Sequence, residues 1–195
     1  MLQPKQKALE EIIEETLAFL RGEDLETYRF NVEQCTRLSL EAKHYIDLQP
    51  ADWPQLTFNW DLSAESQRFS LDGNGVKLPN FQLRYPEGFI LGWVDLKEFD
   101  DKLCHFSRRE GIQELWELGS KLKLAYVIAY LANGLPITPP LVMPEPGNNY
   151  EVRVQGGHHR YAAAKATGLA VIPIYVEHCN RKEVTRIVPV HWNDS

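Results

Sequence analysis

The chain has 195 residues, of which 44% are hydrophobic and 25% charged, and it contains 12 glycines and 12 prolines. This composition is ordinary for a soluble globular protein, so it excludes a collagen-like, a fibrous or a wholly disordered chain. The 27 acidic residues outnumber the 21 basic residues, which gives a formal net charge of −6. A protein held on DNA by a broad basic face would show the opposite balance.

The cysteines and the apolar segments indicate a cytoplasmic protein. The three cysteines are odd in number and form no CxxC pair, so we expect neither a disulfide framework nor a thiolate zinc site, and we assign no metal ligands. The first residues lead into the charged stretch Glu10–Glu15, so no signal peptide is expected. The longest apolar stretch, Leu122–Leu131, is too short to span a bilayer, and we expect no membrane insertion.

The N-terminal half predicts a helix followed by short strands. Over Lys5–Leu20, apolar residues recur at helical spacing with glutamates on the other face. From Gln49 to Gly92, segments such as Leu56–Leu62 and Phe81–Tyr85 alternate or carry aromatic residues, and Asp72–Gly75 is a strong turn signal. These residues predict a β-rich extension behind an N-terminal helix.

The C-terminal half predicts alternating helices and strands. The expected elements are a strand or turn at Val94–Phe99, a helix at Ile112–Ala132 ended by Asn133-Gly134, strands at Leu141–Met143 and Tyr150–Val154, a helix at His159–Thr167 ended by Gly168, and strands at Val171–Val176 and Arg186–Val190. We therefore predict a mixed α+β fold in two parts. Residues 1–89 would form an extension packed on a core of residues 90–195.

The segment Gly156–Arg160 contains the main candidate residues for ligand binding. Gly156 and Gly157 follow a predicted strand and come directly before a helix whose first turn holds His158, His159 and Arg160. Glycines let a backbone approach a phosphate closely, the unpaired N–H groups of a helix start point at it, and the helix dipole adds partial positive charge. Arg160 can bind phosphate oxygens through both arms of its guanidinium, and His159 can donate a further hydrogen bond. The alternative is a tight strand-to-helix turn with surface histidines.

These residues resemble the partition-protein-B/sulfiredoxin (ParB/sulfiredoxin-like) superfamily. Gly156–Ala163 reads GGHHRYAA and differs at one of eight positions from the GGCHRYAA motif that cradles ATP phosphates in sulfiredoxins. The likeness extends to Asn133–Val142 and Gly168–Ile174 and covers roughly residues 90–178. It implies a ParB/sulfiredoxin-like core that binds ATP at Gly156, Gly157, His158, His159 and Arg160, with Mg²⁺ as the accompanying ion.

The resemblance also assigns residues outside the glycine turn. It places a phosphate-contacting lysine at Lys123 and a further pocket position at Thr138. Asp95 and Glu98 follow the strand that opens the family core, where a pair of carboxylates could hold Mg²⁺ or activate water. With His159 and Arg160 they form the predicted catalytic set. For Lys123 and the two carboxylates, the alternative is an ordinary solvent-facing charge.

Two departures from the family motifs restrict the reactions that the resemblance can imply. His158 stands where sulfiredoxins carry the catalytic cysteine, and an imidazole cannot form the thiosulfinate intermediate. Sulfinic acid reduction is therefore not expected. The Glu-Arg pair of the partition-protein motif, which binds CTP, is also missing.

The resemblance extends to the plasmid fertility-inhibition proteins of the oncogenic-suppression type. It predicts an ATP-binding enzyme with ATPase and DNase activity that blocks conjugative DNA export. The implied partners are the coupling protein of a type IV secretion system, the relaxase, and DNA bound at a local site. Two alternatives stay open: a non-enzymatic module regulated by the nucleotide, and a kinase of a small molecule such as free serine.

Residues 150–195 hold six basic and four acidic residues, which suits one focused anion site.

Overall fold

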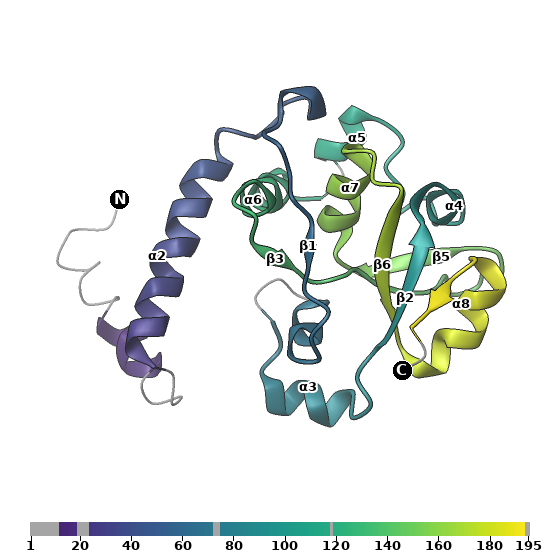
Figure 1. Ribbon diagram of the computed structural model, residues 1–195, viewed down its shortest axis with the longest axis horizontal. Coiled ribbons are helices and arrows are strands. Elements are labelled where there is room, and N and C mark those ends of the chain that lie inside the picture. Colours follow the sequence, from purple (N-terminus) through teal and green to yellow (C-terminus); the bar gives the residue numbers. More distant parts are fainter. Residues whose placement is uncertain (1–11, 19–23, 72–74, 118, 194–195) are drawn as a thin grey trace. The chain divides into compact units, whose positions relative to one another are not determined.

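Figure 1 shows the computed structural model, which describes residues 12–18, 24–71, 75–117 and 119–193. The chain divides into two compact units, residues 1–41 and residues 42–195. Of the predicted turn at Asp72–Gly75, only Gly75 lies within the described residues.

The described part of the first unit is helical. Residues 12–18 form a helix within the predicted Lys5–Leu20 segment, whose other residues lie outside the described part, and α2 spans Leu25–Ala42. Arg29 of α2 donates two parallel hydrogen bonds of 2.8 Å to Glu15 of the other helical segment. The sequence patterns above do not predict α2, on which large apolar residues such as Phe30 remain exposed.

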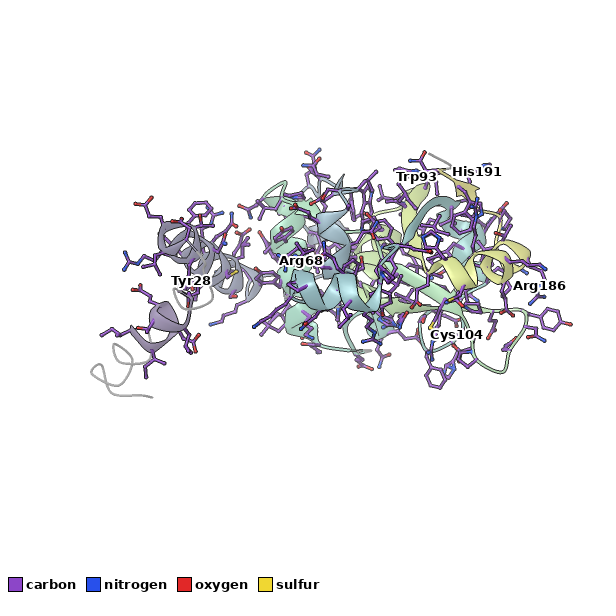
Figure 2. All side chains as sticks on the ribbon, turned by 90° about the horizontal axis from the view of Figure 1, so that it is seen from below. Tyr28, Arg68, Trp93, Cys104, Arg186 and His191 are labelled. Atoms are coloured by element: carbon purple, nitrogen blue, oxygen red, sulfur yellow. The ribbon has the colours of Figure 1, made fainter. Side chains whose placement is uncertain are left out.

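A five-stranded mixed sheet forms the centre of the second unit. Its strand order is β5-β4-β6-β2-β7, and only the β4–β6 pair is parallel among these neighbours. In this order the strands span Val152–Gly156, Leu141–Pro144, Val171–Val176, Ile90–Asp95 and His191–Trp192. Figure 1 shows β2 and β6 side by side, and Figure 2 shows Trp93 of β2 close to its partner His191 of β7.

The second unit also contains six helices in its described part. They are α3 (Leu78–Arg84), α4 (Leu96–Asp101), α5 (Ile112–Glu117), α6 (Lys121–Ala132), α7 (His158–Ala166) and α8 (Arg181–Ile187), accompanied by the 3₁₀ turns η1 (Pro50–Asp52), η2 (Glu65–Phe69) and η3 (His178–Asn180). The predicted mixed α+β fold class is thereby confirmed. Among the described helices, none combines the length and apolar character that a membrane crossing requires.

The core lies on both faces of the sheet, as the central strand β6 shows. Ile172 and Ile174 of β6 belong to the larger cluster, which also contains buried residues of α4, α7 and α8. Tyr175 points to the opposite face and packs with Phe81 of α3 and with Phe89. Alternate residues of a strand point to opposite faces, so a strand buried on both faces reads as a continuous apolar run. This explains why β6 coincides with its predicted bounds.

The predicted β-rich extension is wrong. The described residues between 49 and 89 contain only one short strand, β1 (Asn59–Trp60), which pairs in parallel with β3 (Pro136–Ile137). The predicted strand at Phe81–Tyr85 falls on α3 and its end, where the two aromatic rings lie one helical turn apart with centroids 5.4 Å from each other. Residues 42–89 belong to the same compact unit as residues 90–195, so the division of the chain lies after residue 41 and not after residue 89.

Two further predicted strands are corrected. The segment Val94–Phe99 contains the end of β2 and the start of α4, because the Asp95 carboxylate accepts a hydrogen bond from the Glu98 N–H at 2.9 Å and caps that helix. The strand expected at Arg186–Val190 falls on the end of α8 and the residues after it.

The predicted helix at Ile112–Ala132 is divided into α5 and α6. Gly119 adopts φ +107°, a backbone conformation that favours glycine, and the hydroxyl of Ser120 accepts a hydrogen bond from the Lys123 N–H at 3.3 Å. The break gives α6 its own N-terminus. The predicted end at Asn133-Gly134 is confirmed, with Gly134 at φ +64°.

A buried carboxylate connects α4 to α7. Asp100 accepts hydrogen bonds from the hydroxyl of Tyr161 and from Nζ of Lys165, which lies 2.8 Å from each carboxylate oxygen. Lys165 also donates to the carbonyl oxygen of Arg109 at 2.5 Å, and the Arg108 guanidinium lies 3.5 Å from Asp100. Burial, together with the bond to Asp100, raises the pKa of Tyr161 far above its usual range. The network therefore contains a stable neutral phenol donor.

Replacing Asp100 should destabilise the fold. In Asp100→Asn, Lys165 loses its buried counter-charge, and we expect the free energy of unfolding to fall by about 2–4 kcal/mol. The matched control is Asp101→Asn on the same helix, because the Asp101 side chain is 60% exposed and Asp100 only 12%. Urea denaturation of both variants measures the difference, and equal stabilities would contradict the assigned network.

Candidate functional site

The glycine turn between β5 and α7 is packed against the chain itself. Gly157 adopts φ +91°, which an L-residue with a side chain rarely takes. At Gly156, a Cβ atom would lie only 2.1 Å from the backbone carbonyl oxygen of Ser70. The close backbone approach that Gly156 permits is therefore used by Ser70, and a phosphate cannot occupy that position.

Arg160 binds backbone carbonyl groups in the interior. Its Nη1 donates to the carbonyl oxygens of Thr138 at 2.5 Å and Pro139 at 3.2 Å, and its Nη2 donates to those of Ser70 at 2.9 Å and Phe69 at 3.3 Å. Burial lowers the pKa of Arg160 to about 10, so it remains charged at neutral pH. We call this arrangement the Arg160 clamp. The predicted arrangement had both arms of Arg160 bind a phosphate. In the structure, all four Nη hydrogens have acceptors within the protein instead.

Thr138 belongs to the same internal arrangement. It is buried, its hydroxyl donates to the carbonyl oxygen of Ser66 at 3.3 Å, and its own carbonyl accepts from Arg160. Thr138 therefore connects β3 and β4 to the Arg160 clamp, and its hydroxyl is engaged within the protein.

His159 lies where the starts of α6 and α7 meet. A Cβ atom on Gly119, next to the first residues of α6, would lie 3.2 Å from Nε2 of His159. Nε2 is buried and has no hydrogen-bond partner among the described residues. Burial, and then the positive charges of His158, Arg109, Lys123 and Arg160, lower the pKa of His159 to about 4. The imidazole is therefore neutral at pH 7.

Lys123 is the predicted site residue that the fold brings close to His159. It is exposed in the first turn of α6, and its charge acts on His159. Apart from the Lys123 N–H, which the Ser120 hydroxyl caps, the first N–H groups of α6 and α7 lack partners within their own helices, and both helix dipoles place partial positive charge at these ends. We define the α6–α7 anion site as these two helix N-termini together with His159 and Lys123.

His158 points to a different part of the surface. It contributes to a pocket of about 390 Å³ that we call the His158 pocket, lined by Cys104, Phe106, Ser107, Glu145, Arg153, Val154, Gln155 and His158. Burial, and then the charges of Arg109 and Arg160, lower the pKa of His158 below its ordinary value. Consecutive residues of a helix point about 100° apart, so the side chains of His158 and His159 face different parts of the structure.

Asp95 and Glu98 lie far from the glycine turn. The strand register leads from the turn across the sheet. Gly156 of β5 pairs with Leu141 of β4, and Leu141 pairs with Tyr175 of β6. Tyr175 in turn pairs with Leu91 of β2. Asp95 lies four residues further along β2, about 13 Å along the strand, and three strand spacings of about 5 Å separate β5 from β2. The predicted catalytic pair therefore does not meet the α7 N-terminus.

The side chains at the α6–α7 anion site do not fit the predicted Mg²⁺. Magnesium in proteins is bound through carboxylates together with phosphates and water. No group of three or more His, Cys, Asp or Glu residues suited to a metal is present among the described residues, and the charges that shift the pKa values of His158 and His159 are positive. We therefore derive no step through a metal.

Sequence reasoning missed the segment Cys104–Ser107, which runs along the free edge of β5. The Cys104 N–H donates to the carbonyl of Val152 at 2.8 Å, and the Val154 N–H donates to the Ser107 hydroxyl at 3.0 Å. Figure 2 marks the position of Cys104 in this unit. The alternation of apolar and polar residues over Val152–Gln155 was the available signal, because alternate residues of a strand share a face and Arg153 and Gln155 therefore lie together.

Comparison with known proteins adds no relative: no protein-family model, curated protein or solved structure matches the chain. The class that the structure defines is a mixed α+β protein with a strand–glycine–helix turn. The superfamily resemblance rests on Gly156–Ala163 and its two flanking segments.

Gly156→Ala should destabilise the protein. The added methyl group would overlap the Ser70 carbonyl group, so the turn or the facing backbone must move, and we expect a loss of about 1–3 kcal/mol in the free energy of unfolding. The control is Gly111→Ala, where a Cβ atom has open space around it. Chemical denaturation measures both variants. A Gly156→Ala variant as stable as the control would contradict the packing against Ser70.

His159 should make the stability depend on pH. Its ordinary pKa is 6.5 and its pKa in the fold is about 4, so the unfolded chain takes up the proton at the higher pH. The stabilisation is fully present above pH 6.5 and is lost as the pH falls towards 4, by up to about 3 kcal/mol. In His159→Gln this contribution should disappear from the pH dependence of unfolding, measured in urea from pH 7 to pH 4. Identical pH profiles for the two proteins would refute the assignment.

Proposed function

We propose that the protein binds a nucleotide through its phosphates at the α6–α7 anion site and uses it as a conformational ligand. The buried Nε2 of His159, without a partner between two helix N-termini, is the observation that carries the proposal. An N–H group at this atom would donate to a phosphate oxygen. The ATP of the superfamily resemblance is the first nucleotide to test.

The local charges favour an anion. Helix N-termini bind phosphate through free N–H groups and partial positive charge, and Lys123 adds a full charge on a flexible stem. Burial is the main cause of the lowered pKa of His159, and the positive charges that add to it raise the potential at the same place. A bound phosphate would offset the mutual repulsion of these positive charges. Binding should therefore stabilise the folded protein.

The position of the carboxylates favours binding over hydrolysis. General-base catalysis needs a base within hydrogen-bond reach of the attacking water. The register of the sheet separates Asp95, the last residue of β2, from the glycine turn, and Glu98 follows in the first turn of α4. The predicted ATPase and DNase activities, and the inhibition of conjugative transfer with a coupling protein, relaxase or DNA as partner, stay predictions that rest on the resemblance. Of the functions predicted from the sequence, we favour the non-enzymatic module regulated by the nucleotide.

Lys123→Gln should weaken binding of ATP and of inorganic tripolyphosphate by about threefold to tenfold, because an exposed charge contributes modestly. The control is Lys97→Gln, because Lys97 is also an exposed lysine near the start of a helix, α4. Titration calorimetry gives the affinities, and the rise of the melting temperature with ligand provides a second measurement. Absence of binding by the wild type, or equal affinities of the two variants, would refute the proposed site.

Phosphate release from ATP separates binding from hydrolysis. The binding module should leave ATP intact over the time of the calorimetric experiment. Turnover that disappears in Asp95→Asn or Glu98→Gln would instead restore the predicted enzyme.

A further inference from the structure

The His158 pocket contains two acceptor atoms that nothing in the described structure satisfies. Oε2 of Glu145 and Oε1 of Gln155 are both buried and have no hydrogen-bond partner among the described residues. A buried polar atom without a partner is costly, so such atoms in a pocket point to a ligand that supplies the missing donors. The terminal torsions of Glu and Gln are broad, so either oxygen can change its direction at low energetic cost. The pocket thus offers two acceptors to N–H groups.

The same pocket contains a strong donor. Arg153 of β5 also lines the pocket, and its Nη2 is 3.3 Å from the sulfur of Met143, which is a weak acceptor. A carbonyl oxygen on a ligand would be a much better partner for the guanidinium. The pocket therefore combines acceptors for two N–H groups with a donor for one carbonyl group.

An exposed aromatic ring lies in the lining of the pocket. Phe106 is 74% exposed, and its ring centroid is 4.1 Å from that of His105. Large exposed aromatic side chains are suited to stacking on a nucleobase, because every base has a flat π-face. The pocket volume of about 390 Å³ lies in the range of small-molecule sites, roughly 300–1,000 Å³.

The donor and acceptor pattern distinguishes the bases. Guanine presents an N1–H, an exocyclic amino group and a carbonyl oxygen along one edge, so it can satisfy both acceptors and the guanidinium together. Adenine has an amino group but no carbonyl group, and cytosine has a single donor group. We propose that the His158 pocket binds the guanine base of the nucleotide whose phosphates occupy the α6–α7 anion site.

The two sites are contiguous at the start of α7. His158 is the first residue of this helix and lines the pocket, and His159, the next residue, belongs to the anion site. A nucleotide would therefore cross the helix N-terminus, with its base on the His158 side and its phosphates on the His159 side. The inference rests on the proposed function and replaces the ATP of the superfamily resemblance with a guanine nucleotide.

Affinities for GTP, ATP and inorganic tripolyphosphate test the base pocket, measured by titration calorimetry on the full chain. The wild type should prefer GTP to ATP. Glu145→Gln keeps the shape of the side chain but removes the charged acceptor, so GTP affinity should fall about tenfold or more while tripolyphosphate affinity stays unchanged. The control is Glu65→Gln, an exposed residue that does not line the pocket and makes the same change in charge.

A second variant removes the stacking surface without disturbing the core. Phe106→Ala should weaken GTP and ATP alike, by about fivefold or more, and leave tripolyphosphate binding unchanged. The control is Leu83→Ala, because Leu83 is 86% exposed and lies on α3.

The outcomes separate the two proposals. If tripolyphosphate, ATP and GTP bind equally and Glu145→Gln has no effect, the guanine pocket is refuted while the phosphate site stands. If none of the three binds, the proposed function is refuted. If GTP alone binds and Lys123→Gln leaves its affinity unchanged, the base pocket stands and the phosphate site is refuted.

Discussion

The buried charge of Arg160 is the constraint on which the site depends. A guanidinium in the interior is tolerated only if its donors are paired, and here four backbone carbonyl groups supply the partners. Two carbonyls come from the end of η2 at residues 69–70 and two from the link between β3 and β4 at residues 138–139. The first turn of α7 is thereby attached to segments that precede it by up to 91 residues. The directions of His158 and His159 follow from this attachment.

The glycine pair shows how one local pattern permits two arrangements. A strand, two glycines and a helix start are suited to a phosphate, yet the space beside Gly156 is filled by the Ser70 carbonyl group. The proposed anion site then lies towards α6, where Gly119, next to the N-cap residue Ser120, lies close to His159 of α7. Both helix starts contribute partial positive charge there. The break between α5 and α6 is therefore as important for this site as the glycine turn.

Elements with strong local signals could be predicted from the sequence. The run Val171–Val176 is apolar because the strand is buried on both faces, and the helix after Gly157 is bounded by glycines at both ends. The segment at residues 49–89 could not be predicted, because its aromatic residues pack in a cluster from a short helix and loops. Their order along the chain resembles strand alternation although the contacts are tertiary. The separation of Asp95 from Gly156 could not be predicted for a related reason, since it depends on strand register.

For the site, the sequence by itself determined the residue types at two helix starts: glycines and histidines at the α7 N-terminus, and a lysine in the first turn of α6. Local chemistry is sufficient for this, because backbone freedom and helix dipoles act over a few residues. Only the tertiary structure decided which groups remain available to a ligand. It directed Arg160 and Thr138 inward, left Nε2 of His159 without a partner, and brought Glu145, Arg153 and Phe106 to one pocket. The physical reason is that a polar group's availability depends on the partners that distant segments bring to it.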